Sequence, residues 1–286
     1  MRYHLPVVLL LSLILLSSVT DAKETQKTDG SGAKQATEIA VVPTANETNK
    51  AGASATKQAT EIEMVSVKGG CYKMGDAFGT GRSDEMPTHK ICLDDFSIGK
   101  YEVTQAQWMA VMGNNPASNV ACGQNCPVEN VSWIDVQEFI KRLNGMTGKN
   151  YRLPSEAEWE YSARSGGKNE LWAGTIDEAK LGDYAWFVDN SEEKTHPVGE
   201  KKPNGLGIYD MTGNVWEWCQ DLHDDNYYKK SPVKNPQGPP RGQARVTRSG
   251  SWASKSWELR ATARGRIFPK NKNPGLGFRL VLSSAK

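Results

Sequence analysis

Apolar residues recur at helical spacing in two stretches of the chain. In the longer stretch, residues 133–145, they fall at intervals of three and four positions: Trp133, Val136, Phe139, Ile140 and Leu143. Ser132 precedes this stretch and Thr104 precedes the shorter one, residues 105–113, and both are residue types that cap helix N-termini. We expect two helices that pack against a core.

A third and shorter helix is predicted in the segment LPSEAEWEYSARSGG. Ser155 and Glu158 have the spacing of a capping box, in which each side chain satisfies a backbone amide of the first turn. Gly166 and Gly167 follow and are typical of a helix end, because glycine readily takes the left-handed conformation found there.

Short apolar runs bounded by turn residues predict strands. Three such runs precede the first helix: MVSV at 64–67, CYKM at 71–74 and ICLDDFSI at 91–98. Past Gly166 we expect only loops and short strands, with large tryptophan side chains beside glycine-rich turns. The pattern predicts an irregular α+β fold with short strands, two to three helices and long ordered loops.

The N-terminal residues 1–22 are typical of a cleavable signal peptide. A basic residue is followed by an apolar block from Leu5 to Leu16 and then by small residues, with Thr20 and Ala22 before the expected cleavage point. A membrane anchor is the alternative, but the block is shorter than the roughly 20 residues that span a bilayer. We expect a secreted or periplasmic protein without a stable membrane anchor.

Residues 23–63 differ in composition from the rest of the chain. They are rich in Ala, Thr, Lys, Gln and Gly, and the hexapeptide KQATEI occurs at 34–39 and again at 57–62. Such a segment buries too little apolar surface to fold. We therefore predict a flexible low-complexity tether over 23–63 and one folded domain over 64–286.

The overall charge excludes one class of partner. The chain has 286 residues and a formal net charge of +2, with 24% charged residues. A nearly neutral chain of this kind creates no large electrostatic field of either sign, so nucleic acid is not an expected partner.

Export changes the interpretation of the cysteines, because an oxidising compartment favours disulfides. Cys71 and Cys92 lie in neighbouring predicted strands, and Cys122 and Cys126 lie in one loop, so we expect two bridges, Cys71–Cys92 and Cys122–Cys126. A metal pair is the alternative for the second two, but no histidine is near them. Cys219 is left over, and we expect it to be buried.

Few residues have an arrangement that predicts catalysis. His89, His196 and His223 are far apart along the chain, and the sequence has no GxSxG nucleophile motif. In DMTGNVWEW, Asp210 and Glu217 bracket a tight turn whose oxygens suit a hard cation such as calcium. The alternative is that polar side chains merely satisfy the amides of this turn.

Eight segments taken in order resemble the sulfatase-modifying factor family, whose founding activity is the formylglycine-generating enzyme. They are GGCYKMG, YEVTQAQW, PVENVSW, YRLPSEAEWEYSAR, THPVG, PNGLGIYDMTGNVWEW, RSGSW and LGFRLV. The resemblance covers nearly all of residues 64–282. It implies a C-type-lectin-like fold of the formylglycine-generating enzyme type.

The resemblance also implies a calcium site. Family members bind calcium in the segment that corresponds to Asp210, Gly213, Val215 and Glu217. Two of these residues offer side-chain oxygens and two offer backbone carbonyls, so we expect calcium as a structural cofactor.

The copper chemistry of the family is not expected here. The oxidases hold Cu(I) with two thiolates, because this ion prefers soft sulfur ligands. Ser254 stands at the first thiolate position, and the stretch up to RATAR has no cysteine. Ser251 and Trp216 match residues that line the oxidase pocket. The resemblance therefore implies a pocket whose copper ligands are missing.

Three functions are consistent with these features. The first is an exported binding or maturation-accessory module that is stabilised by calcium and acts on an exported protein or peptide, or on a glycan. The second is a divergent oxidase that modifies a cysteine or serine of an exported protein, and the third is an assembly protein of the cell envelope. Whether any reaction is catalysed is left open by the sequence.

Six aromatic residues are candidate ligand platforms: Trp172, Trp186, Trp252, Trp257, Tyr227 and Tyr228.

Overall fold

The computed structural model describes residues 60–283. The predicted signal peptide, most of the predicted tether and the first copy of KQATEI lie outside the described residues. Packing begins slightly before the predicted boundary at residue 64, because Ile62 is buried and the Glu61 carbonyl accepts a hydrogen bond from the Gln107 side chain. None of the helices within 60–283 is both long and apolar enough to span a membrane.

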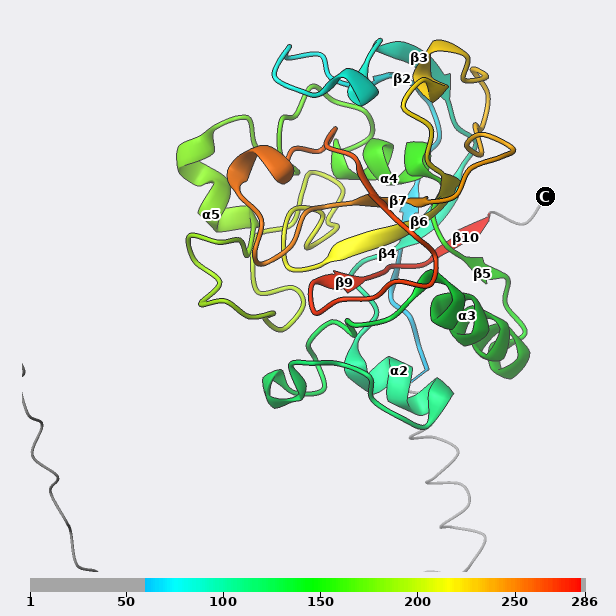
Figure 1. Cartoon of the computed structure of the whole chain (residues 1–286), viewed down its shortest axis with the longest axis vertical. Coiled ribbons are helices and arrows are strands. Elements are labelled where there is room, and N and C mark those ends of the chain that lie inside the picture. The colour runs from blue at the N-terminus through cyan, green and yellow to red at the C-terminus, as the bar shows by residue number, and fades with distance from the viewer. Residues whose placement is uncertain (1–59, 284–286) are drawn as a thin grey trace, which may run out of the picture. The chain divides into compact units, whose positions relative to one another are not determined.

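The described residues form three small sheets. The first has the strand order β1-β4-β10-β5, and all its pairs are antiparallel. Its strands are β1 (Met64–Val67), β4 (Phe96–Gly99), β10 (Val281–Ser283) and β5 (Tyr151–Arg152). Strand β10 lies between two strands that precede it by more than a hundred residues, so the sheet joins both ends of the domain (Figure 1).

The second sheet is a hairpin and the third is mixed. Strands β2 (Cys71–Met74) and β3 (His89–Cys92) form the hairpin. The third sheet has the order β8-β7-β6-β9, in which only β6 and β9 run parallel. Its strands are β6 (Trp216–Leu222), β7 (Arg245–Arg248), β8 (Gly265–Ile267) and β9 (Leu276–Gly277).

The three predicted helices are confirmed, and so are their N-caps. They are α2 (Gln105–Met112), α3 (Trp133–Thr147) and α4 (Glu156–Ala163). The third helix has Arg164 as its C-cap, so it ends before the predicted glycines Gly166 and Gly167. The side chains of Thr104, Ser132 and Ser155 each accept a hydrogen bond from the backbone N–H three residues later. The first two helices end at glycines in the left-handed conformation.

The two larger of three hydrophobic clusters lie on either side of the third sheet. One joins α2 and α3 to the strands near them, and Trp108 of α2 stacks on Phe139 of α3 with ring centroids 5.1 Å apart. Phe278 meets both rings edge-on. The other cluster lies around α4, where Trp159 is fully buried, and Figure 1 shows α4 next to β6 and β7. Both faces of the third sheet are thus covered.

The structure differs from the predicted elements in two places. Residues 91–98 do not form one strand, because β3 pairs with β2 and β4 pairs with β1, and residues 93–95 between them belong to neither sheet. The predicted loop region beyond Gly166 contains a one-turn helix, α5 (Leu181–Tyr184), which is too short to show a period in the sequence. Five 3-10 turns complete the described elements: η1 (Ser83–Glu85), η2 (Val120–Cys122), η3 (Glu178–Lys180), η4 (Tyr227–Lys229) and η5 (Ser256–Glu258).

Candidate functional site

The stretch that corresponds to the copper-binding segment, residues 248–265, runs from the end of β7 to the start of β8, and its arginines are buried. Arg248 is fully buried and donates to the carboxylate of Glu160 at 2.6 Å. It also donates to the carbonyls of Ala261, Thr262 and Ala263 at 2.8–2.9 Å. A single guanidinium therefore fixes the backbone of residues 261–263.

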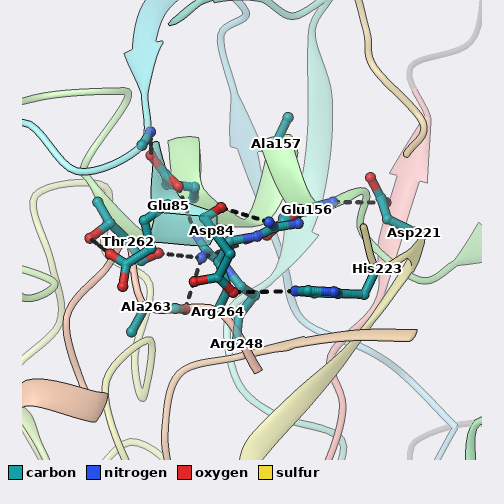
Figure 2. A network of polar contacts seen from close by, with 12 residues as sticks. Asp84, Glu85, Glu156, Ala157, Asp221, His223, Arg248, Thr262, Ala263 and Arg264 are labelled. Carbon is teal, nitrogen blue, oxygen red and sulfur yellow. Dashed lines mark hydrogen bonds and ion pairs between the residues drawn. The ribbon is translucent and has the colours of Figure 1, made fainter. Parts of the chain in front are cut away.

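Two further arginines of this stretch make buried ion pairs with distant elements. Arg260 contacts both oxygens of Glu85, at 2.7 and 2.8 Å, and Arg264 contacts both oxygens of Glu156, at 2.6 and 2.9 Å. Figure 2 shows the second pair beside Arg248. Since a buried charge is costly without its partner, these pairs hold the stretch against α4 and η1.

Ser251 and Ser254 lie together in one turn, and both are buried. The Ser254 Oγ accepts from the Ser251 N–H at 3.2 Å, and the Ser251 Oγ accepts from the Ala253 N–H at 3.3 Å. Both hydroxyls therefore satisfy amides of the turn that carries them. Hydroxyls that accept these hydrogen bonds stabilise the loop, and a hydroxyl oxygen is not a soft metal ligand.

Trp216 is partly buried and lies near the same turn through its backbone. Its N–H donates to the carbonyl of Gly275 at 2.8 Å, and Gly275 in turn faces the side chain of Ser251. The ring of Trp216 packs beside Gly265 of β8. The structure thus places the three predicted pocket residues around one loop, and the hydroxyls of Ser251 and Ser254 are engaged in internal contacts.

All five cysteines of the chain fall within the described residues. Cys71 is bonded to Cys92 and Cys122 to Cys126, which confirms both predicted bridges. Cys219 is fully buried, as predicted, and burial raises the pKa of its thiol well above the usual value. No two free thiols are present, so the residues do not fit the two-thiolate Cu(I) site of the oxidases.

The four predicted calcium positions lie at or just before the start of β6, and oxygens of Asp210, Gly213 and Glu217 already have partners within the protein. The Glu217 carboxylate accepts from Arg279 at 2.7 Å through each oxygen, and from Trp159 at 2.7 Å. The Asp210 carboxylate accepts from a backbone amide at 2.8 Å, and the Gly213 carbonyl accepts from a serine hydroxyl at 3.0 Å. Arg279 also donates to the carbonyl of Asp210, so it links the two acidic residues.

Carboxylates outnumber cationic side chains around these positions. Glu102, which sequence analysis did not single out, accepts from the Val215 N–H at 3.2 Å and is buried with Asp210 and Glu217. Burial raises the pKa of Asp210 to about 6, and it raises the pKa of Glu102 well above the usual value, with Asp210 and Glu217 adding to the effect. Among the described residues in contact with these three carboxylates, Arg279 is the one cation. Calcium prefers hard oxygen donors that carry an excess of negative charge, and the donor atoms here are of this type.

Comparison with known proteins accounts for this architecture. Residues 49–284 match the family model described as the sulfatase-modifying factor enzyme 1-like domain. The chain belongs to this family. It is 32% identical to the chaperone protein LppX of Paenibacillus barcinonensis, over 73% of the chain and 87% of that protein. It is also 32% identical to the formylglycine-generating enzyme of Streptomyces coelicolor, over 74% of the chain and 87% of that enzyme.

Solved structures agree with the fold that the resemblance implied. Treponema denticola variable protein 1 superposes with a TM-score of 0.71 and 32% identity, over 77% of the chain and 94% of that structure. The α+β, C-type-lectin-like fold of this sulfatase-modifying-factor-like domain is therefore confirmed.

The candidate aromatic platforms of this sulfatase-modifying-factor-like domain separate into core and surface residues. Trp172, Tyr227 and Tyr228 are buried, whereas Trp257 in η5 is 51% exposed. Trp186 and Trp252 are partly buried. Trp257 is thus the candidate that most clearly faces solvent.

A stacked group next to the Ser254 turn was not predicted. Trp186 stacks on His196 with ring centroids 3.8 Å apart, and the ammonium of Lys201 lies 3.7 Å from the Trp186 ring centroid. These residues come from the segment 185–201, which contacts the Ser254 turn through a hydrogen bond from the Val188 N–H to the Ser254 carbonyl. No spacing in the sequence pointed to this group, because stacking pairs leave no local pattern.

Proposed function

We propose that this chain is an exported binding or maturation-accessory module that is stabilised by calcium and does not form formylglycine through copper chemistry. The proposal rests first on the cysteines, since four are in disulfides and Cys219 is buried. Ser254 stands at the first copper-ligand position and caps its own turn. The LppX relative is named a chaperone, which supports an accessory role toward another protein.

Export and partner class follow from the sequence features. Residues 1–22 would direct the chain to a secreted or periplasmic location through a cleavable signal peptide, and residues 23–63 would serve as a tether. The proposed partner is an exported protein or peptide, or a glycan, and neither nucleic acid nor a stable membrane anchor is part of the proposal.

The proposed calcium ion would be held by the carboxylates of Asp210 and Glu217 and the carbonyls of Gly213 and Val215. When bound, it would neutralise part of the buried acidic charge. A carboxylate has about four acceptor positions, so Glu217 can keep its contacts with Arg279 and Trp159 while it also contacts a cation.

A surface near the Ser254 turn is proposed as the binding face. Trp257, Ile176 and Val188 are each between 47% and 64% exposed. Val188 is tied to the turn by its backbone hydrogen bond to Ser254. Trp172, which forms a β-bridge with Thr175 just before Ile176, donates to the Ser256 carbonyl at 2.9 Å. Exposed apolar side chains gathered on one loop surface are typical of a site that binds another molecule.

The absence of copper chemistry can be tested directly. We expect no aldehyde when the chain is expressed together with a protein that carries a Cys-x-Pro-x-Arg segment and copper is supplied. Mass spectrometry of the segment gives the readout, and the Streptomyces coelicolor enzyme serves as the positive control. Aldehyde formation by this chain would establish the divergent oxidase instead.

The binding face makes a separate prediction about where partners attach. A photo-crosslinking residue in place of Trp257 should capture a protein, peptide or glycan of the exported fraction. The same residue in place of Met146 of α3, which is 50% exposed, is the matched control. Equal capture at both positions, or capture at neither, would contradict a binding face at η5.

A further inference from the structure

A histidine and two aspartates from distant parts of the chain meet at one end of the third sheet. Asp84 belongs to η1, His223 directly follows β6, and Asp225 lies in the next loop. The Nε2 of His223 is 3.4 Å from the Asp84 carboxylate, and its Nδ1 is 3.8 Å from the Asp225 carboxylate. Figure 2 shows the imidazole of His223 and the carboxylate of Asp84 facing each other.

The three side chains have the spacing of metal ligands. One ligand atom from each of Asp84, His223 and Asp225 lies within 4.8 Å of the others, and this is the one such group of histidine, cysteine and acidic residues in the part of the chain that the structure describes. One imidazole and two carboxylates suit a divalent transition-metal ion such as zinc, whereas calcium prefers an all-oxygen set.

The position of the group allows an ion to enter. A hollow of about 480 Å³ is lined by Asp84 and Asp225, and a neighbouring hollow of about 350 Å³ is lined by His223 and Asp225. The His223 side chain is only 4% exposed, while that of Asp225 is 57% exposed. The group therefore has one buried ligand and one exposed ligand, beside space for water or a further ligand.

Arginines compete for the two carboxylates, but weakly. Arg82 is 3.4 Å from Asp84 and Arg266 is 2.8 Å from Asp225, and both arginine side chains are more than half exposed, whereas the Asp84 side chain is only 12% exposed. The Arg266–Asp225 pair is exposed on both sides, and such pairs contribute only about 0 to 1 kcal/mol, so a metal ion can displace Arg266. Arg264 is held by Glu156 and donates to the Asp84 carbonyl, which leaves the Asp84 carboxylate to the metal.

We propose that Asp84, His223 and Asp225 bind one divalent transition-metal ion, with the remaining coordination positions open toward the two hollows. Arg82, Arg266 and Arg241 line these hollows. Their charges would favour an anionic fourth ligand on the metal, such as a carboxylate or phosphate group.

Zinc titration of the full chain, purified without a histidine tag, tests the site. Calorimetry in the presence of excess calcium should show one Zn²⁺ bound per chain. Replacing zinc by Co²⁺ should give the visible absorption of a low-coordinate ion with nitrogen and oxygen ligands. Calcium in excess should leave both signals unchanged, which separates this site from the proposed calcium site.

Two variants and two matched controls decide whether the named residues are the ligands. His223→Asn and Asp225→Asn should each weaken zinc binding more than ~10-fold, because loss even of a residue that orients a ligand costs about 10 to 100-fold. His196→Asn and Asp183→Asn, whose side chains lie outside both hollows, should bind zinc as the original chain does. Asp225 is exposed, so its variant keeps the test valid if His223→Asn fails to fold.

Three results would overturn the proposal. The first is the absence of stoichiometric zinc binding by the original chain. The second is unchanged affinity in Asp225→Asn, and the third is an equal loss in the control variants, which would indicate adventitious binding elsewhere.

Discussion

Replacement of Glu160 by Gln is expected to lower the free energy of unfolding by about 3 to 5 kcal/mol. Glu160 of α4 is fully buried and accepts from Arg248 at 2.6 Å, from Arg164 at 3.0 Å and from the Gly75 N–H at 2.9 Å. Glutamine has nearly the same shape but no charge. The variant therefore leaves the buried guanidinium of Arg164 without a carboxylate, and it leaves that of Arg248 with only Glu156, at 3.8 Å.

Urea unfolding followed by tryptophan fluorescence measures this loss. The control is Glu138→Gln, which removes an exposed pair with Arg142 one turn away on α3 and should cost at most about 0.5 kcal/mol. A loss of less than about 1 kcal/mol in Glu160→Gln, as for an ordinary hydrogen bond, would show that the buried arginines do not depend on Glu160.

The second large effect is expected at Glu217, and it depends on calcium. In chelator, Glu217→Gln should lose about 3 to 5 kcal/mol, because Arg279 is fully buried and would lack its partner. In the original chain, calcium at ~100 times its dissociation constant should add about 2.7 kcal/mol. The variant should lose most of this increment as well.

The calcium increment, measured as the difference in unfolding free energy with and without chelator, separates the two effects. Glu160→Gln is the matched control, since it should lose comparable stability from another buried ion pair yet keep the full increment. Equal increments in the original chain and in Glu217→Gln would contradict a calcium site at this residue. Loss of the increment in both variants would indicate a general effect of instability.

Local features of the fold were predictable, whereas the ion pairs were not. The helix starts at Thr104, Ser132 and Ser155 were found because a cap and its partner are three residues apart. The pairing of Arg260 with Glu85 spans 175 residues, and no local pattern encodes such a distance. One usable signal was an arginine inside an apolar run, since Arg279 in LGFRLV is buried against Glu217.

In the candidate sites, too, local motifs were predictable and contacts between distant residues were not. The turn with Asp210 and Glu217 was visible as a motif, but Glu102, which lies 113 residues before the Val215 amide it accepts from, was not. His223 appeared to be isolated because Asp84 is 139 residues away from it. The stretch 248–265 was recognised by its position in the family pattern. Only the structure shows that its arginines form ion pairs with buried glutamates.

The place of β10 in the first sheet has a consequence for biosynthesis. Because β10 lies between β4 and β5, the sheet cannot close until the last described residues have been synthesised. The core depends on the same segment, since Phe278 and Arg279 are both fully buried. Contacts of such high sequence separation form late and slowly. A nascent chain of this topology therefore completes its core only after β10 has been made.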